Sequence, residues 1–311
     1  MKIELKAWLL LFVLAGIWGS SFILMKKGMF HDEGVSIFSA MQVGALRITI
    51  ASSVLLPFGI FNLRKIKSLK HLTFLALVGV FGNFIPAFLF TYAETGLSSG
   101  YAGMLNSFTP IFTLIIGFIV FKVRLSTVQL LGVIIGFIGI VLLMLAGSDF
   151  NSSGTWWQIA AIVLATFMYG ISLNTIKHTL QNFSALEITS IAFTLVFIPS
   201  LIANYTFGTV STLQTNPFAM EGLTAISILA IFGTALANIV FNRVITYTST
   251  LFASGVTYFI PIVAVFIGLG FGEHITFFQI IAMIVVLFGV FIANYWNIIF
   301  IRLKKNSTIN D

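Results

Sequence analysis

The chain of 311 residues has no cysteine and little charge, and each shortage excludes a class of protein. Without cysteine there are no disulfides, no thiolate metal sites and no thiol catalysis. Charged residues make up 8% of the chain, hydrophobic residues make up 59%, and the mean hydropathy is +1.07. A typical water-soluble domain carries about 25% charged residues. The composition therefore indicates a protein whose surface faces lipid.

Acidic residues are scarce, because the chain has nine in all and only Asp32 and Glu33 are adjacent. Membrane enzymes that modify lipids generally use clustered aspartates that bind Mg²⁺, or a His/Asp pair at the membrane surface. The sequence therefore predicts no enzyme, no metal site and no cofactor. The net charge of +7 comes from Lys and Arg in short loops between apolar runs, which argues against a nucleic-acid-binding face.

Apolar runs of about 20 residues recur along the chain, and each can cross a hydrocarbon core of about 30 Å as a helix. The sequence predicts an all-α integral membrane protein with ten transmembrane helices. The first run continues to Met25 without a small-residue cleavage site, so we expect a helix there and not a signal peptide. The ten expected ranges are 7 to 25, 35 to 60, 72 to 92, 96 to 121, 126 to 147, 156 to 176, 186 to 204, 223 to 242, 250 to 271 and 276 to 299.

The basic residues divide unevenly between the two sides of such a bundle, which predicts its orientation. With a cytoplasmic N-terminus, only Lys26 and Lys27 lie outside, while Asp32, Glu33, Glu94, Asp149, Glu221 and Glu273 occupy the outer side. The inner side carries Lys2, Lys6, Arg64, Lys65, Lys67, Lys70, Lys122, Arg124, Lys177, Arg243, Arg302, Lys304 and Lys305. We therefore expect both termini in the cytoplasm.

The stretch Ser98 to Pro110 has an echo 151 residues later, at Ser249 to Pro261. The same shift places Trp18 on Tyr169 and Gly82 on Gly233, and after one inserted residue Gln129 falls on Gln279. Five helices per copy is an odd number, so the second copy enters the membrane from the opposite face. The pattern predicts a 5+5 inverted-topology repeat, residues 1–148 and 149–311, with a site near the midplane between the copies that opens alternately to each side.

Four features in order resemble one known family over residues 7 to 300. They are Trp18-Gly19-Ser20-Ser21-Phe22 in the first helix, Arg47 in the second, and Ala/Ser-rich runs before Pro110 and Pro261. The set resembles the EamA branch of the drug/metabolite transporter superfamily. That family often has Gly-Glu-Arg after the fourth and ninth helices and a Gln six residues beyond the Glu. The second half has Gly272-Glu273-His274 with Gln279, whereas the first has Lys122-Val123-Arg124 with Gln129. The resemblance implies a bacterial inner-membrane exporter of amino acids or related small metabolites.

Arg47 is the one charged residue within the expected helix cores. Ionisable groups inside a membrane are costly and often functional. Arg47 either offers a positive charge to a substrate anion or fixes its helix against its neighbours, and its repeat position, Ile198, carries no charge.

Uncharged polar and aromatic residues near the helix centres are the other candidates for a substrate cavity. Their amide and hydroxyl groups suit a zwitterionic ligand, although interhelical hydrogen bonding is an alternative role. The predicted cavity residues are Trp18, Asn83, Asn106, Tyr169, Asn174, Thr234, Asn238, Thr257 and Tyr258. Pro110 and Pro261 are predicted to kink the fourth and ninth helices, either as a gate or as static bends.

No Asp, Glu or His lies in the middle of an expected helix. The sequence therefore predicts facilitated or exchange transport that an intramembrane, proton-titrating carboxylate does not drive. A channel-like pore is the alternative, and an integral-membrane lipid-modifying enzyme ranks behind it. The expected partners are the lipid bilayer and a small-molecule substrate. Gly132 and Gly136 permit close helix packing or a dimer face, so the sequence allows a monomer or a homodimer.

Overall fold

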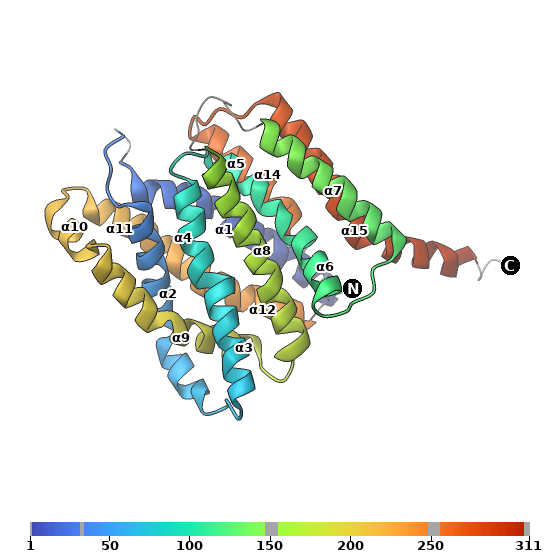
Figure 1. Ribbon diagram of the computed structural model, residues 1–311, viewed down its shortest axis with the longest axis horizontal. Coiled ribbons are helices and arrows are strands. Elements are labelled where there is room, and N and C mark those ends of the chain that lie inside the picture. The colour runs from blue at the N-terminus through green and yellow to red at the C-terminus, as the bar shows by residue number, and fades with distance from the viewer. Residues whose placement is uncertain (1, 32–33, 147–154, 248–255, 308–311) are drawn as a thin grey trace.

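The computed structural model describes residues 2–31, 34–146, 155–247 and 256–307, and nearly all of them are helical (Figure 1). The first half contains α1 (Lys2–Met29), α2 (Ala40–Leu63), α3 (Leu69–Gly79), η1 (Val80–Phe84), α4 (Ile85–Ala93), α5 (Ser99–Leu105), η2 (Asn106–Phe108), α6 (Thr109–Ile119) and α7 (Thr127–Ala146). The second half contains α8 (Thr155–Thr179), α9 (Ala185–Thr206), α10 (Thr209–Thr215), α11 (Ala219–Ile228), η3 (Leu229–Leu236), α12 (Ala237–Tyr247), α14 (Val256–Gly270) and α15 (Phe277–Ser307).

The expected helices are confirmed. Eight continuous helical segments in the described residues are long and apolar enough to cross a membrane, and Val256–Gly270 and Phe277–Ala293 are shorter apolar helices. The range expected at 126 to 147 is Thr127–Ala146, and that expected at 186 to 204 is Ala185–Thr206. The expected boundary between residues 148 and 149 lies outside the described residues, as do Asp149 and residues 249–255 of the echo that ends at Pro261.

The inverted repeat is visible in how the helices pack. Helix α2 packs on its own repeat mate α9, and α7 packs on its mate α15. The remaining contacts come in related pairs, because α1 packs on α14 as α8 packs on α6, and α4 packs on α8 as α12 packs on α1. Thr49 Oγ1 donates a hydrogen bond to Ser200 Oγ at 2.8 Å, and these residues are 151 positions apart. A residue that touches its own repeat mate lies on the pseudo-two-fold axis.

Close approach of α7 and α15 depends on glycine, and the two helices run side by side along one edge of the molecule (Figure 1). A Cβ atom at Gly289 would collide with the backbone of Gly136, and one at Gly139 would lie 2.6 Å from the Val286 nitrogen. The small residues let the helix backbones touch, which gives the dispersion contacts that hold helices together in lipid. The expected close packing at Gly132 and Gly136 therefore occurs within one chain.

Both glutamines of the family pattern are helix caps. Gln129 accepts from the backbone N–H of Ser126 at 2.9 Å and its own N–H donates to Ser126 Oγ at 3.2 Å. Gln279 makes the same two bonds with Thr276. Each is a capping box that satisfies two otherwise unpaired N–H groups at a helix start. The repeat match between Gln129 and Gln279 thus has a structural cause.

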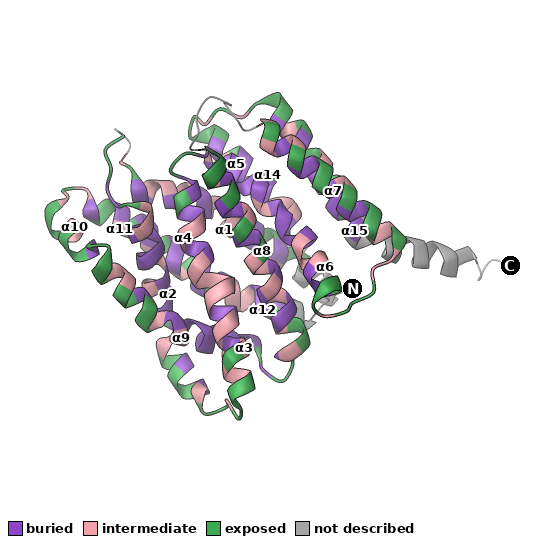
Figure 2. Ribbon diagram, viewed as in Figure 1, coloured by how far each residue is buried: buried purple, intermediate pink, exposed green. Residues whose placement is uncertain are grey.

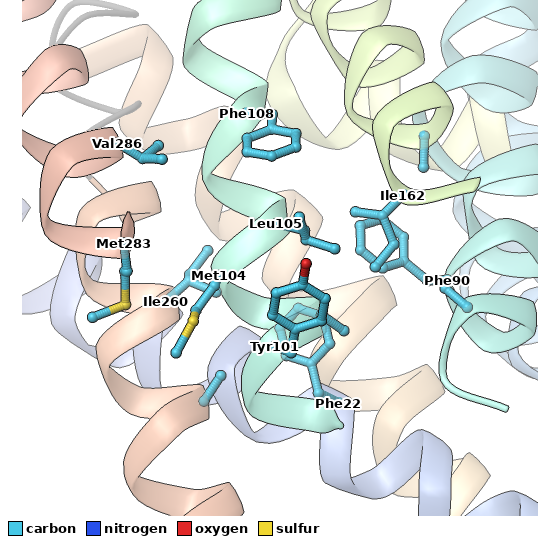
Figure 3. Close-up of a cluster of buried hydrophobic side chains, with 14 of the residues drawn as sticks. Phe22, Phe90, Tyr101, Met104, Leu105, Phe108, Ile162, Ile260, Met283 and Val286 are labelled. Carbon is cyan, nitrogen blue, oxygen red and sulfur yellow. The ribbon is translucent and has the colours of Figure 1, made fainter. Parts of the chain in front are cut away.

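The largest cluster of buried side chains joins the two halves (Figure 3). At its centre, α5 and η2 place Tyr101, Met104 and Phe108 against residues of α1, α4, α8, α14 and α15, and the Tyr101 hydroxyl donates to the Leu143 carbonyl at 2.7 Å. Large apolar side chains are exposed on the outward faces of α7 and α9 (Figure 2), as expected of a surface in contact with lipid.

Candidate functional site

A cavity of about 150 Å³ lies between the two halves of the described structure. Its wall is built from both repeats, and it includes polar side chains that are far apart in the sequence. The predicted residues that line it are Trp18, Arg47, Asn83, Asn106, Pro110, Tyr169, Thr234, Asn238 and Thr257. Other lining residues include Ser21, Met25, Phe90, Ser172, Ile176, Thr189, Phe241 and Asn242.

Two aromatic pairs face the cavity and are related by the repeat. On α1, the Trp18 ring meets Phe241 edge-on at a centroid distance of 5.0 Å. On α8, Tyr169 stacks on Phe90 at 5.9 Å. The 151-residue shift relates Trp18 to Tyr169 and Phe90 to Phe241, so the two pairs occupy equivalent positions in the two copies. Trp18 also donates from Nε1 to the carbonyl of Gly233 at 3.0 Å, which fixes the orientation of the indole ring.

The helices that carry Asn83 and Thr234 contain π-helical turns at equivalent positions, η1 and η3. A π-helical turn widens the helix and changes which backbone groups are paired, and such turns are frequent at functional sites. Thr234 Oγ1 donates to the carbonyl five residues earlier, Leu229, at 3.2 Å. Across the cavity, Asn238 Nδ2 donates to Asn83 Oδ1 at 3.2 Å. The two halves are thus joined by amides in the cavity wall.

Arg47 extends from α2 across to the second repeat. Its Nε donates to Thr234 Oγ1 at 2.8 Å, and its Nη1 lies 3.6 Å from the sulfur of Met25. The ion pairs found among the described residues do not include Arg47. The guanidinium group is therefore held by neutral groups at the edge of the cavity, where it can contact an anionic group of a ligand.

The fourth transmembrane segment is interrupted beside the cavity. Asn106 begins a turn of 3₁₀-helix, and Pro110 lies in the first turn of the next helix, α6. Thr109 Oγ1 donates to the Asn106 carbonyl at 3.0 Å. Pro261 lies inside the continuous helix α14 instead. The two prolines are repeat mates in sequence but occupy different helical settings.

Three predicted residues lie outside the cavity wall. Asn174 is buried, and its Nδ2 donates to the carbonyls of Thr113 and Gly170 at 2.8 Å each, so it joins α8 to α6. Tyr258 packs against the main core cluster, and Pro261 is buried within α14. The sequence predicts how far along its helix each of these residues lies. It does not predict which side of the helix each side chain occupies.

The sequence interpretation did not single out several lining residues. Asn242 Nδ2 donates to Thr189 Oγ1 at 2.9 Å at one end of the cavity. A Cβ atom added to Gly82 would collide with the hydroxyl of Ser172. A Cβ atom added to Gly233 would lie 2.8 Å from the hydroxyl of Ser21. The 151-residue shift relates both serines and both glycines, so the same repeat match would have found this second pair.

Comparison with known proteins decides the family. The model of the EamA-like transporter family matches residues 5–145 and 156–295. The chain belongs to this family. It is 27% identical to the uncharacterized inner membrane transporter YedA of Escherichia coli (strain K12), over 93% of this chain and 91% of that protein.

Two further relatives have names that mention a cargo. A probable terminal-alkyne amino-acid exporter of Streptantibioticus cattleyicolor is 22% identical, over 66% of this chain and 68% of that one. A probable amino-acid metabolite efflux pump of Salmonella typhimurium is 30% identical, over 47% and 46%. A solved crystal structure matches 93% of this chain and 96% of its own with a TM-score of 0.59 at 14% identity, which shows a shared fold.

In this EamA-family transporter, a charged cluster begins at Lys26, the residue that follows the cavity-lining Met25. Glu273 follows α14 and accepts from Lys26 Nζ at 2.8 Å. The same carboxylate accepts from the backbone N–H groups of Ser99 and Gly100, at 2.8 and 2.9 Å, at the start of α5. We call Lys26, Glu273 and these two N–H groups the latch. The latch ties α1, α5 and α14 together.

The charge of Glu273 is stabilised in place. Burial alone raises the pKa of this carboxyl, but the hydrogen bonds from Lys26, Gly100 and Ser99 outweigh that effect and hold the pKa below its ordinary value. The positive end of the α5 helix dipole acts in the same direction. Glu273 is therefore ionised throughout the physiological pH range.

The first repeat has the turn but not the latch. Val123 N–H donates to the Gly117 carbonyl and Glu273 N–H donates to the Gly268 carbonyl, although the first turn is one residue longer. The preceding residues, Lys122 and Gly272, both have positive φ. Val123 therefore occupies the position of Glu273. Position 123 therefore offers no carboxylate to Lys177, the repeat mate of Lys26.

Proposed function

We propose that this chain exports amino acids or related small metabolites across the bacterial inner membrane by alternating access at the cavity between its repeats. The observation that supports this proposal is a cavity with matched walls from two inverted copies, since such a site can be exposed to either side by similar movements. The two halves that move relative to each other are residues 1–148 and 149–311.

The chemistry of the wall suits a zwitterion. Arg47 provides a positive charge for a carboxylate, and the amides of Asn83, Asn106 and Asn238 supply donors and acceptors for an amino group and for a polar side chain. Two relatives are named as exporters of amino acids or their metabolites. These names favour the same class of cargo for this chain.

The cavity also bears on energy coupling. The described residues that line it include no Asp, Glu or His. This composition supports transport down a substrate gradient, or by exchange, without a titrating carboxylate in the wall. The distribution of the basic residues supports an orientation with the Lys26 end outside and both termini in the cytoplasm.

Counterflow in proteoliposomes separates this proposal from a channel-like pore. A preloaded unlabelled amino acid accelerates uptake of the labelled one through a carrier, whereas a pore gives no such acceleration. Each metabolite of a test set is assayed for counterflow in this way. If some metabolites permeate but none shows counterflow, the protein is a channel-like pore. Turnover of a lipid precursor by the purified protein would instead support the membrane-enzyme alternative.

The cavity assignment is tested with Asn83→Ala and Asn106→Ala. Loss of one hydrogen bond to a charged ligand group costs about 1.5–3 kcal/mol, so we expect apparent affinity to fall about 10- to 100-fold at unchanged expression. Asn204→Ala is the matched control, because Asn204 joins α9 to α2 outside the cavity, through Thr49. Normal transport by both cavity variants would show that the assignment is wrong.

A further inference from the structure

Glu94 is a buried acid that does not line the cavity. It directly follows α4, its residue is 1% exposed, and neither carboxyl oxygen has a hydrogen-bond partner among the described residues. An ionised carboxylate without such partners is expensive to bury. The backbone carbonyls at the end of α4 add a negative partial charge beside it. Burial without partners therefore favours the protonated form of Glu94.

Glu94 lies between the cavity and the latch. Its N–H donates to the carbonyl of Phe90, one helical turn earlier on the same face, and the Phe90 ring lines the cavity. Charged groups act on Glu94 from three elements: Lys26 of α1, Arg47 of α2 and Glu273 after α14. From α8 comes the titratable ring of Tyr169, which stacks on Phe90.

The two acids near Lys26 have opposite environments. Burial raises the pKa of Glu94, which lies beyond the end of the membrane-spanning segment Leu69–Ala93, well above its ordinary range; the positive charges of Lys26 and Arg47 offset this only in part. Glu273, by contrast, is ionised and holds Lys26. As the pH rises, Glu273 therefore loses its proton first, and Glu94 keeps its proton to a higher pH.

We propose that the carboxyl group of Glu94 is a proton-binding site that controls the latch. With its proton bound, Glu94 leaves Lys26 on Glu273, and this end of the cavity stays closed. Without the proton, the negative charge of Glu94 competes with Glu273 for Lys26, which weakens the hold on α5 and favours opening. The proton binds and leaves at the same side of the membrane, so it is not transported. This inference rests on the proposed alternating access.

The sign of the pH effect follows from the two environments. Water reaches Glu94 when the end opens, and its pKa then returns towards the ordinary value. The proton therefore stabilises the closed state at low pH, and that stabilisation is lost as the pH rises through the raised pKa. Each unit of difference in pKa between the two states changes their ratio up to about tenfold. Acid at the Lys26 side closes the cavity, and alkali opens it.

The absence of native cysteine allows a direct test with one introduced thiol. Ser21→Cys is nearly isosteric and places the thiol in the cavity wall. A membrane-impermeant maleimide is added at the Lys26 side of vesicles, with the other side buffered at constant pH. The labelling rate of Ser21→Cys is divided by the labelling rate of Val35→Cys, a variant at an exposed residue of the same end. This ratio corrects for the effect of pH on the reactivity of the thiol itself. We expect this ratio to rise at least about tenfold from pH 6 to pH 9.

In the Glu94→Gln background, the ratio is expected to stay at its pH 6 value throughout. Glu94→Met serves as a second neutral variant if the amide is poorly folded. Glu221→Gln is the matched control, since Glu221 pairs with His31 at the same end and is half exposed; it should keep the full pH dependence. A flat profile with Glu94 present, or a steep profile in both neutral variants, would overturn the proposal.

The assay also separates this inference from the proposed function. Labelling of Ser21→Cys from both sides without pH dependence would refute the role of Glu94 and leave alternating access intact. Labelling from one side alone, at every pH and with every substrate tested, would refute alternating access itself.

Discussion

Neutralising Glu273 should open the Lys26 end of the cavity. Glu273→Gln keeps the size of the side chain but removes the charge that binds Lys26 and the start of α5. Hydrogen bonds to a charged group contribute about 1.5–3 kcal/mol each. Lys26 is partly exposed to water, and a glutamine oxygen can still accept one bond, so we take a net loss of about 2 kcal/mol from the closed state.

That loss corresponds to about a 30-fold change in the ratio of closed to open protein. The assay is the labelling rate of Ser21→Cys from the Lys26 side at pH 7, and we expect an increase approaching that factor. Lys26→Met should have a similar effect, and the double variant should add little, since both changes remove one interaction. Labelling within about threefold of the parent in both single variants would refute a latch of this strength.

Two more predictions concern the repeat. Gly289→Leu should lower the midpoint of thermal unfolding in detergent by several degrees or more, because its Cβ would already lie 2.2 Å from the backbone nitrogen of Gly136 on α7. Gly16→Leu, with nothing within 4 Å of its Cβ position, should leave that midpoint nearly unchanged. Oxidation of Thr49→Cys/Ser200→Cys should form a disulfide on the pseudo-two-fold axis, where relative movement is smallest, and should leave counterflow at half the parent rate or better. Abolished counterflow would contradict an axis at this place.

Much of the fold could be predicted from the sequence because each helix must be apolar over its whole length. Hydropathy locates such segments within a few residues, and the odd number of helices per copy determines the inverted relation of the copies. The short helix α10 and the π-helical turns of η1 and η3 have no comparable signal. They depend on packing between helices, which hydropathy does not report.

The cavity residues were predictable to the extent that the repeat constrains them. Trp18 and Tyr169 are related by the shift, and both line the cavity. Asn174 shows the limit, because its position along α8 does not tell which side of that helix the amide faces, and the structure turns it towards the carbonyl of Thr113 on α6. Glu94 has the typical sequence position of a loop residue, and the sequence gives no sign that the folded chain buries it to 1% exposure.

Under the proposed alternating access, Val123 in place of the Glu273 of the second copy would make transport unequal in its two directions. A ligand that binds only one of two conformations has an apparent affinity reduced by the fraction of protein in that conformation. With the latch closing one end of the substrate-free protein, cargo arriving from the Lys177 side meets the favoured conformation. Cargo arriving from the Lys26 side meets the rare one, and its apparent affinity is about 30-fold weaker by the energy of the latch alone. In the proposed exporter, one carboxylate would thus give a pseudo-symmetric carrier a preferred loading side, and export requires that side to be the cytoplasm.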